Sequence, residues 1–178
     1  MQNKEFGFTI VEMLVVVLLV GIFSAILIAN FQGASTNAVI LERAALGVIS
    51  NIRRAQSLSI AGVAYQSNPI CGYGIHYTDN ETYLIYAGGE NICSTSNKNY
   101  QSGNDYSYQQ VKIIEKNVEF KSSFNDVFFV PPDPKTYINN SFSLSASPLA
   151  ISIGFKGLSC PAYCKTISVF PSGKIDLN

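Results

Sequence analysis

The longest apolar run in the sequence covers residues 8–31, which read FTIVEMLVVVLLVGIFSAILIANF. No charged residue lies between Met13 and Ala29, and no proline interrupts the run. As a helix, its 24 residues would extend about 36 Å, more than the roughly 30 Å of a bilayer's hydrocarbon core. The run is longer than the apolar part of a secretory signal peptide, and no clear small-x-small cleavage site follows it. The pattern therefore predicts a membrane-spanning helix that remains on the chain.

Helical periodicity continues beyond the apolar run, from Ala34 to Ala61. One face of this stretch carries small or apolar residues three or four positions apart, namely Leu41, Ala45, Val48, Ile52, Ala55 and Ser59. Such spacing is typical of an amphipathic helix, and Gly62 is suited to end it. The pattern predicts an amphipathic continuation over residues 32–62, either as one helix or with a soft spot near Gly33. We expect its apolar stripe to pack on a β-sheet.

After Tyr65 the periodicity changes to short alternating runs, which are typical of strands. Turn residues such as Gly88-Gly89 separate these runs. The sequence predicts strands at residues 73–77, 82–87, 111–114, 118–120, 127–130, 142–147, 151–155, 166–170 and 174–177, with a hairpin turn at residues 170–174. Residues 63–178 should form an antiparallel β domain. The predicted fold class is α+β, a long N-terminal α-helix packed on a C-terminal antiparallel β-sheet domain.

Parts of this region are expected to lie outside the sheet or to face solvent. Residues 91–108 are polar and poor in aliphatic side chains, which indicates an exposed loop. Three prolines within four positions, Pro131, Pro132 and Pro134, should prevent normal ladder pairing at that point. His76 lies in an alternating pattern that predicts a solvent-facing strand residue.

Composition and charge narrow the classes of function. Charged residues make up 13% of the 178 residues, and 12 Lys and Arg balance 12 Asp and Glu. This balance argues against a generic nucleic-acid binder, which needs clustered positive charge. The 47% share of apolar residues argues against intrinsic disorder. A single histidine excludes a multi-histidine metal site, and no group of residues marks a catalytic centre. We therefore expect neither an enzyme nor a cofactor.

Glu12 is the unusual residue of the apolar run. A carboxylate at such a position costs about 2.5–3.5 kcal/mol on membrane-insertion scales, so it needs a partner unless it reaches the membrane interface by snorkelling. The sequence from Gly7 to Glu12 reads GFTIVE, after a short polar leader and before the long apolar stretch. This combination resembles the class III signal of type IV pilins and pseudopilins.

The resemblance implies a route of processing and assembly. In that family a prepilin peptidase removes the leader, here residues 1–7, by cutting after the position of Gly7. The new N-terminal residue, here Phe8, is N-methylated, and residues 8–31 serve as a transmembrane and filament-core helix. Glu12 matches the family's glutamate at the fifth mature position, and Thr9 matches a common choice at the second. The Phe8 amine of one subunit would then pair with Glu12 of its neighbour and set the register of assembly.

The same resemblance implies a structural function and a set of partners. The protein would be a subunit of a type II secretion pseudopilus or a type IV pilus. Its partners would be the prepilin peptidase, other pilin or pseudopilin subunits, the inner-membrane assembly platform and the lipid bilayer. Before assembly it would be a single-pass protein of the cytoplasmic membrane, with its C-terminal domain extracytoplasmic.

Residues 49–62, ISNIRRAQSLSIAG, are similar to a second pattern, found in GspH/FimT-type minor subunits. The match is loose and runs through Ile52, Ala55, Gln56, Ser57 and Gly62. It points to a minor subunit, for which a DNA-receptor minor pilin of a competence pilus is the alternative function. That alternative needs a basic stripe, whereas residues 63–178 hold eight lysines, no arginine and nine acidic residues. Nucleic acid is therefore not an expected partner.

Four cysteines, Cys71, Cys93, Cys160 and Cys164, all follow the membrane segment. The resemblance places this part of the chain outside the cytoplasm, where disulfides are expected. Three pairings are possible, and proximity in sequence favours Cys71–Cys93 and Cys160–Cys164. Zinc held by four thiolates is the other interpretation, although Cys-x3-Cys with a distant second pair fits a zinc ribbon poorly.

Overall fold

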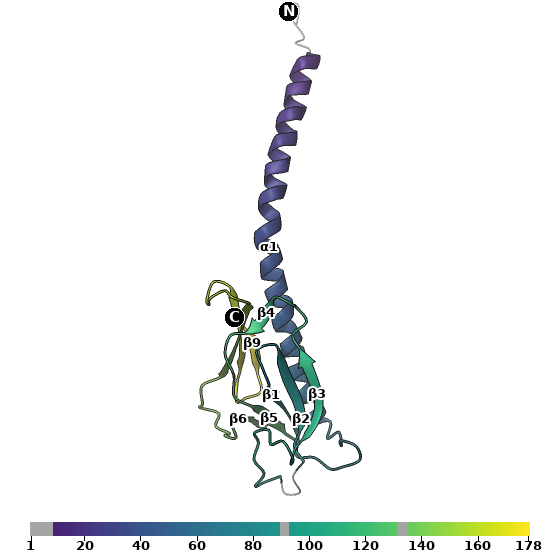
Figure 1. Ribbon diagram of the computed structural model, residues 1–178, viewed down its shortest axis with the longest axis vertical. Helices are drawn as coiled ribbons and strands as arrows, with labels where there is room; N and C mark the ends of the chain where they lie inside the picture. Colours follow the sequence, from purple (N-terminus) through teal and green to yellow (C-terminus); the bar gives the residue numbers. More distant parts are fainter. Residues whose placement is uncertain (1–8, 90–92, 132–134) are drawn as a thin grey trace, which may run out of the picture. The chain divides into compact units, whose positions relative to one another are not determined.

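The computed structural model describes residues 9–89, 93–131 and 135–178, and the side chains of all of these except residues 28–36. The chain divides into two compact units, the first ending at Val39 and the second comprising Ile40–Asn178. The helix α1 (Ile10–Ile60) is one continuous helix that contributes to both units (Figure 1).

The C-terminal end of α1 is fixed by its backbone. The N–H of Val63 donates to the carbonyl of Leu58 at 3.2 Å, and the N–H of Gly62 donates to the carbonyl of Ser59 at 3.0 Å. These two bonds form a Schellman motif, in which the residue at the position of Gly62 must adopt a left-handed backbone conformation. Gly62 adopts that conformation with φ of 60°, so the predicted glycine cap is confirmed.

In the described part of the second unit, nine strands form two antiparallel sheets. The five-stranded sheet has the order β3-β2-β1-β5-β6 and consists of β1 (Tyr73–Tyr77), β2 (Thr82–Ala87), β3 (Tyr106–Lys112), β5 (Val127–Val130) and β6 (Lys135–Ile138). The four-stranded sheet has the order β4-β7-β8-β9 and consists of β4 (Val118–Phe120), β7 (Leu149–Phe155), β8 (Cys164–Val169) and β9 (Ile175–Leu177). The predicted α+β fold class, a long helix with antiparallel sheets, is confirmed.

Some predicted strands need correction. The bounds of β1, β2, β4 and β5 agree with the prediction, and those of β7, β8 and β9 differ by one or two residues. The predicted strand at residues 142–147 is wrong: these residues form an exposed turn, in which the N–H of Ala146 donates to the carbonyl of Ser143 at 3.0 Å. Serine alternates with apolar residues there, which gives the sequence pattern of a strand, but all six side chains are exposed in the structure.

Two further strands were misplaced or missed by the sequence patterns. β3 begins at Tyr106 rather than at residue 111, because its first residues belong to a half-exposed edge strand with no apolar run. β6 was not predicted, yet it pairs with β5 from Val130↔Lys135 to Val127↔Ile138. β5 ends before Pro131, so the ladder ends where the prolines begin, and Pro132 and Pro134 lie outside the described residues.

The main core lies between α1 and the sheets. The predicted helix stripe is confirmed, because Leu41, Ala45, Val48, Ile52, Ala55 and Ser59 are all at most 6% exposed. The apolar members of this stripe join one contiguous cluster with side chains of both sheets, including Ile75, Ile85, Phe129, Ile153 and Ile167. Truncating a buried isoleucine in such a cluster typically costs about 2–5 kcal/mol, so this contact contributes substantially to the stability of the unit.

Two polar side chains of α1 connect the helix to the sheet. Ser59 lies in the apolar stripe, where its hydroxyl donates to the carbonyl of Ala55 at 3.0 Å and accepts from the N–H of Tyr73 at 2.8 Å. Asn51 donates to the hydroxyl of Tyr83 at 2.8 Å, and burial raises the pKa of Tyr83 to about 12. The buried hydroxyl groups of Ser59 and Tyr83 therefore both have hydrogen-bond partners, as buried polar groups need.

The outer face of the five-stranded sheet carries a second, smaller cluster, formed by Cys71, Leu84, Tyr86 and Phe128. Tyr100, from the segment 93–105, packs against this cluster. The prediction of an exposed loop is therefore wrong in part, since Ser96 and Lys98 are 8% and 4% exposed. An exposed apolar sheet face would be costly in water, and the segment 93–105 covers it.

His76 was predicted to face solvent, but in the structure its side chain is half-buried. Its Nδ1 lies 2.8 Å from Oδ1 of Asp126, and its ring centroid is 4.8 Å from that of Tyr100. The other carboxylate oxygen of Asp126 accepts the N–H of Tyr100 at 2.7 Å. The alternating strand pattern gave the correct sheet face for His76, but the segment 93–105 half-buries that face.

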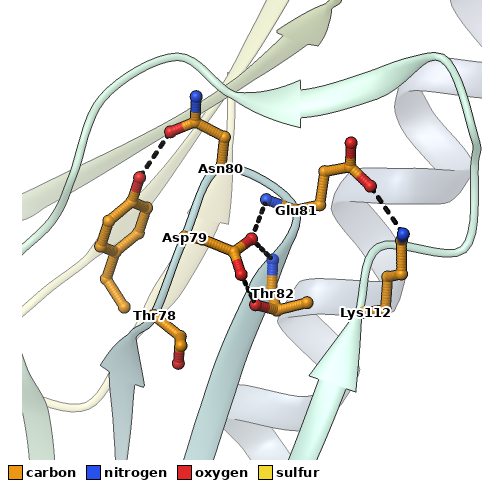
Figure 2. Close-up of a pocket in the computed structure, with 7 residues that line it drawn as sticks. Thr78, Asp79, Asn80, Glu81, Thr82 and Lys112 are labelled. Atoms are coloured by element: carbon orange, nitrogen blue, oxygen red, sulfur yellow. Dashed lines mark hydrogen bonds and ion pairs between the residues drawn. The ribbon is translucent and has the colours of Figure 1, made fainter.

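Glu81 links the two sheets. Its Oε2 lies 2.7 Å from Nζ of Lys112, the last residue of β3, and its Oε1 pairs with Lys156, which directly follows β7. Figure 2 shows the Lys112 contact beside the β1–β2 turn, in which the Asp79 carboxylate accepts the N–H groups of Glu81 and Thr82. Hydrogen bonds from Lys112 and then Lys156 lower the pKa of Glu81.

This link predicts an acid-dependent contribution to stability. A carboxyl group whose pKa is lower in the folded chain stabilises it above the unfolded pKa of about 4.5 and loses that effect as pH falls through the folded value. Glu81→Gln should therefore lower the unfolding midpoint at pH 7 and have progressively less effect below about pH 4.5. The measurement is thermal unfolding of the detergent-solubilised chain from pH 7 to pH 3.

Glu42→Gln is the matched control, because Glu42 is exposed and forms no ion pair among the described residues. Its unfolding midpoint should follow the wild type at each pH. A Glu81→Gln effect that is the same at pH 7 and pH 3 would contradict the assigned link.

Candidate functional site

The first unit contains the segment Ile10–Leu27, which has a mean hydropathy of 2.9 and no buried residue. Exposed apolar side chains cover the whole circumference of the helix, with Leu14 66%, Val17 69% and Phe23 65% exposed. A helix that is apolar on all sides requires a protein interior or a membrane. Among the described residues, this is the one helix segment long and apolar enough to cross a bilayer.

Thr9 caps the beginning of α1. The N–H of Glu12 donates to the Thr9 hydroxyl at 3.3 Å, and the N–H of Met13 donates to the Thr9 carbonyl at 3.2 Å. Thr9 is thus the N-cap, and Glu12 is the third helical residue, the spacing of a capping box. The Thr-x-x-Glu spacing was visible in the sequence, but this local role was not predicted from it.

The capping position does not by itself offset the cost of placing the Glu12 carboxylate in a bilayer. A carboxylate in the first turn interacts favourably with the helix dipole by about 0.3–1 kcal/mol, less than the 2.5–3.5 kcal/mol, roughly, that its placement in a bilayer costs. The Glu12 carboxylate has no ion-pair partner in the described part of the chain. The next basic residue along the sequence is Arg43, 31 positions later. The described residues therefore supply no counter-charge that would offset the cost of placing Glu12 in a bilayer.

The structure describes two of the predicted N-terminal site residues, Thr9 and Glu12, but not the cleavage site. It brings Thr9 and Glu12 together in the first turn of α1. Gly7, Phe8 and the leader at residues 1–7 lie outside the described residues. The cleavage site and the Phe8 amine therefore remain predictions, as does the role of Glu12 and Thr9 in assembly.

The cysteines form a separate pair of sites in the second unit. Cys71–Cys93 and Cys160–Cys164 are disulfides with Cα–Cα distances of 5.1 and 5.2 Å. This is the pairing that sequence proximity favours. Because each sulfur is bonded to another cysteine, none is a thiolate that a zinc site would need.

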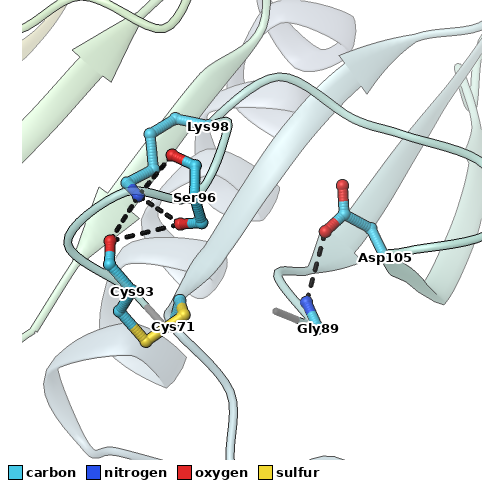
Figure 3. Close-up of a disulfide and its surroundings, with 6 residues drawn as sticks. All are labelled: Cys71, Gly89, Cys93, Ser96, Lys98 and Asp105. Atoms are coloured by element: carbon cyan, nitrogen blue, oxygen red, sulfur yellow. Dashed lines mark hydrogen bonds between the residues drawn. A yellow bond between two sulfur atoms is a disulfide. The ribbon is translucent and has the colours of Figure 1, made fainter. Parts of the chain in front are cut away.

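The Cys71–Cys93 disulfide anchors the segment 93–105 over the outer sheet face (Figure 3). The Lys98 ammonium donates to the carbonyls of Cys93 at 2.6 Å and Ser96 at 2.8 Å, and also contacts the Ser96 hydroxyl. The Lys98 carbonyl accepts the Tyr86 hydroxyl at 2.6 Å. Burial is the main cause that raises the pKa of Tyr86 well above its usual value. The disulfide and these bonds fix the segment on the sheet.

Comparison with known proteins identifies the N-terminal segment. Residues 2–28 match a protein-family model described as the prokaryotic N-terminal methylation motif. The match includes Gly7, Phe8, Thr9 and Glu12. No curated protein and no solved structure matches the chain. The chain therefore carries a type IV pilin-like prepilin signal, followed by an apolar helix suited to membrane anchoring and an α+β unit.

Proposed function

We propose that the protein is a minor pilin or pseudopilin, a structural subunit that assembles through its N-terminal helix into a type II secretion pseudopilus or a type IV pilus. The observation that carries this proposal is the methylation motif at residues 2–28, which overlaps the exposed apolar segment Ile10–Leu27. An exposed apolar surface of this extent requires lipid or other apolar helices. Membrane insertion followed by packing in a filament supplies both in turn.

The proposed mechanism needs no catalysis by this chain. A prepilin peptidase would cut between Gly7 and Phe8, and methylation of the Phe8 amine would leave it positively charged. Glu12 lies in the first turn of α1, close to that new terminus in sequence. A neighbour's Phe8 amine would neutralise Glu12 when the neighbour docks in the correct register. Desolvation offsets much of the attraction, so the pair favours register more than stability.

The proposed location agrees with the cysteine chemistry. The subunit would enter the cytoplasmic membrane as a single-pass protein, with the second unit on the extracytoplasmic side, and would pass from there to the assembly platform. Both disulfides lie in that unit, and disulfides persist in oxidising compartments.

The competence-pilus alternative has less support. Residues 63–178 hold eight lysines against nine acidic residues, and several of the lysines are paired, as Lys112 and Lys156 are with Glu81. Counterion release needs unpaired positive charge facing the phosphates. A DNA receptor is therefore the weaker proposal.

The location of the chain in cells tests the proposed function. Filaments are sheared from the cell surface, and antibody to the second unit quantifies the chain in the filament and membrane fractions. The chain should be present in both fractions, and its deletion should reduce filament number or secretion. An abundant membrane protein that is absent from the filaments, with no deletion phenotype, would contradict the proposal.

A further inference from the structure

Two connections between strands lie side by side at the end of the second unit where α1 enters it. Arg43, close to the start of the unit at Ile40, lies 3.6 Å from Glu115 in the β3–β4 connection. The N–H of Lys156, directly after β7, donates to the carbonyl of Asn117, directly before β4, at 2.9 Å. The β3–β4 and β7–β8 connections therefore share this end, which we name the entry end.

The β7–β8 loop, residues 156–163, is exposed along its whole length and is rich in apolar side chains. It reads KGLSCPAY, and after Lys156 it contains no charged residue and no side-chain amide. Every residue of the loop is exposed, with Leu158 at 43% and Tyr163 at 46%. Exposed loops are normally polar, because apolar surface in water is unfavourable. The composition of this loop suits an apolar environment better than water.

The β7–β8 loop is fixed in shape. The Cys160–Cys164 disulfide closes it, with a Cα–Cα distance of 5.2 Å. The N–H of Leu158 donates to the carbonyl of Phe155 at 3.2 Å, and the N–H of Phe155 donates to the carbonyl of Tyr163 at 3.3 Å. A loop that is already ordered loses little conformational entropy when it binds, so even a small apolar surface is effective.

Two lysines flank the loop, Lys156 before its apolar part and Lys165 after it. The nearest acidic residues in sequence are distant, at Asp133 and Asp176. Lys165 forms no ion pair with any residue that the structure describes. Leucine and tyrosine between lysines are the side chains that a membrane interface favours, since the apolar parts enter the lipid and the ammonium groups face the phosphates.

The length of the connecting chain keeps the entry end near the bilayer. The apolar run ends at Phe31 and the second unit begins at Ile40, nine positions later. As a helix, this connection is about 14 Å long, and lipid headgroups occupy about 5–7 Å of that length. Membrane helices are tilted by about 20° on average, and such a tilt moves one side of the unit closer to the lipid.

We propose that the β7–β8 loop binds the surface of the bilayer in which its own chain is anchored. Leu158 and Tyr163 enter the boundary between acyl chains and headgroups, and Lys165 faces the lipid phosphates. This inference rests on the membrane anchoring in the proposed function. The contact is small and reversible, because apolar area sets the strength of interfacial binding. It holds the unassembled subunit against the membrane and is broken when the subunit joins a filament.

Tryptophan fluorescence tests the contact, because the native chain has no tryptophan. Full-length Leu158→Trp is reconstituted at low density into vesicles of phosphatidylcholine and phosphatidylglycerol, with or without bromine on the acyl chains. Interfacial side chains lie about 5–10 Å into the headgroup and acyl boundary, so brominated lipid should lower the emission about twofold. The emission maximum should also shift to shorter wavelength relative to the detergent-free, lipid-exposed control described next.

Three further variants make the result specific. Leu144→Trp is the matched control, because Leu144 is 71% exposed and precedes β7, whose seven residues place its start about 20 Å from the entry end. Its emission should not be quenched. Val17→Trp, in the apolar segment, should be quenched whenever the chain is inserted. Leu158→Trp/Tyr163→Asp should lose the quenching, since a carboxylate resists transfer into lipid.

The outcomes separate this inference from the proposed function. If Val17→Trp is quenched but Leu158→Trp is quenched no more than Leu144→Trp, the loop contact is wrong while the membrane anchoring stands. A shift of the Leu158→Trp emission without quenching would mean that the loop packs against protein, which also overturns the contact. If Val17→Trp is not quenched, the anchoring is wrong, and the inference fails with it.

Discussion

Glu12→Val should remain in the membrane and keep its folded second unit, but its incorporation into filaments should fall by at least about tenfold. In the proposed mechanism, the substitution would leave a neighbour's Phe8 ammonium group without a partner, and breaking a buried pair in this way costs about 3–5 kcal/mol. Insertion itself should become easier, since an unpaired carboxylate is removed from the apolar segment. The ratio of the variant in sheared filaments to that in membranes, relative to wild type, is the measurement.

The capping geometry makes Glu12→Val a selective change. Thr9 accepts its hydrogen bond from the backbone N–H of residue 12 and not from the Glu12 side chain, so valine keeps the cap. Thr9→Val removes the cap instead and should cost about 0.5–2 kcal/mol of helix stability, with a smaller effect on incorporation. Normal incorporation of Glu12→Val would show that Glu12 only tolerates its position, and the proposed assembly mechanism would be wrong.

Removing the Cys71–Cys93 disulfide should have the largest effect on the folded second unit. Closing a loop of this length, with a sequence separation of 22 residues, stabilises a protein by about 3 kcal/mol in the chain-entropy model. Cys71→Ala/Cys93→Ala should also release the segment 93–105, which covers Tyr86 and Phe128. Denaturant unfolding gives the first effect, and limited proteolysis within residues 93–105 gives the second.

The other disulfide supplies the matched control. Cys160 and Cys164 have a sequence separation of 4 and close a much shorter loop, so Cys160→Ala/Cys164→Ala should cost less and should not change proteolysis of the segment 93–105. If both double variants lose the same stability and show the same proteolysis pattern, the Cys71–Cys93 disulfide does not hold the cover on the outer sheet face.

Local patterns predicted the parts of this protein that depend on local chemistry. The stripe from Leu41 to Ser59 was readable because a helix repeats its buried face every three or four residues. The prepilin signal was readable because its residues are adjacent in sequence. β3 was misplaced at its start, and the cover over Tyr86 was missed, because both depend on contacts between distant residues. The bond from the Tyr100 N–H to Asp126, for example, spans 26 positions.

Glu12 stood out in sequence as a charge inside an apolar run. The hydrogen bond from its backbone N–H to the Thr9 hydroxyl became visible only in the structure.

The mass of the N-terminal peptide of the filament-associated chain tests the central claim most directly. We predict a mature chain of Phe8 to Asn178 with one methyl group on the Phe8 amine, and a Gly7→Leu control that retains Met1 and stays in the membrane. A filament-associated chain that begins at Met1, or after a cut beyond Ala25, would contradict the account of this protein as a processed pilin-like subunit.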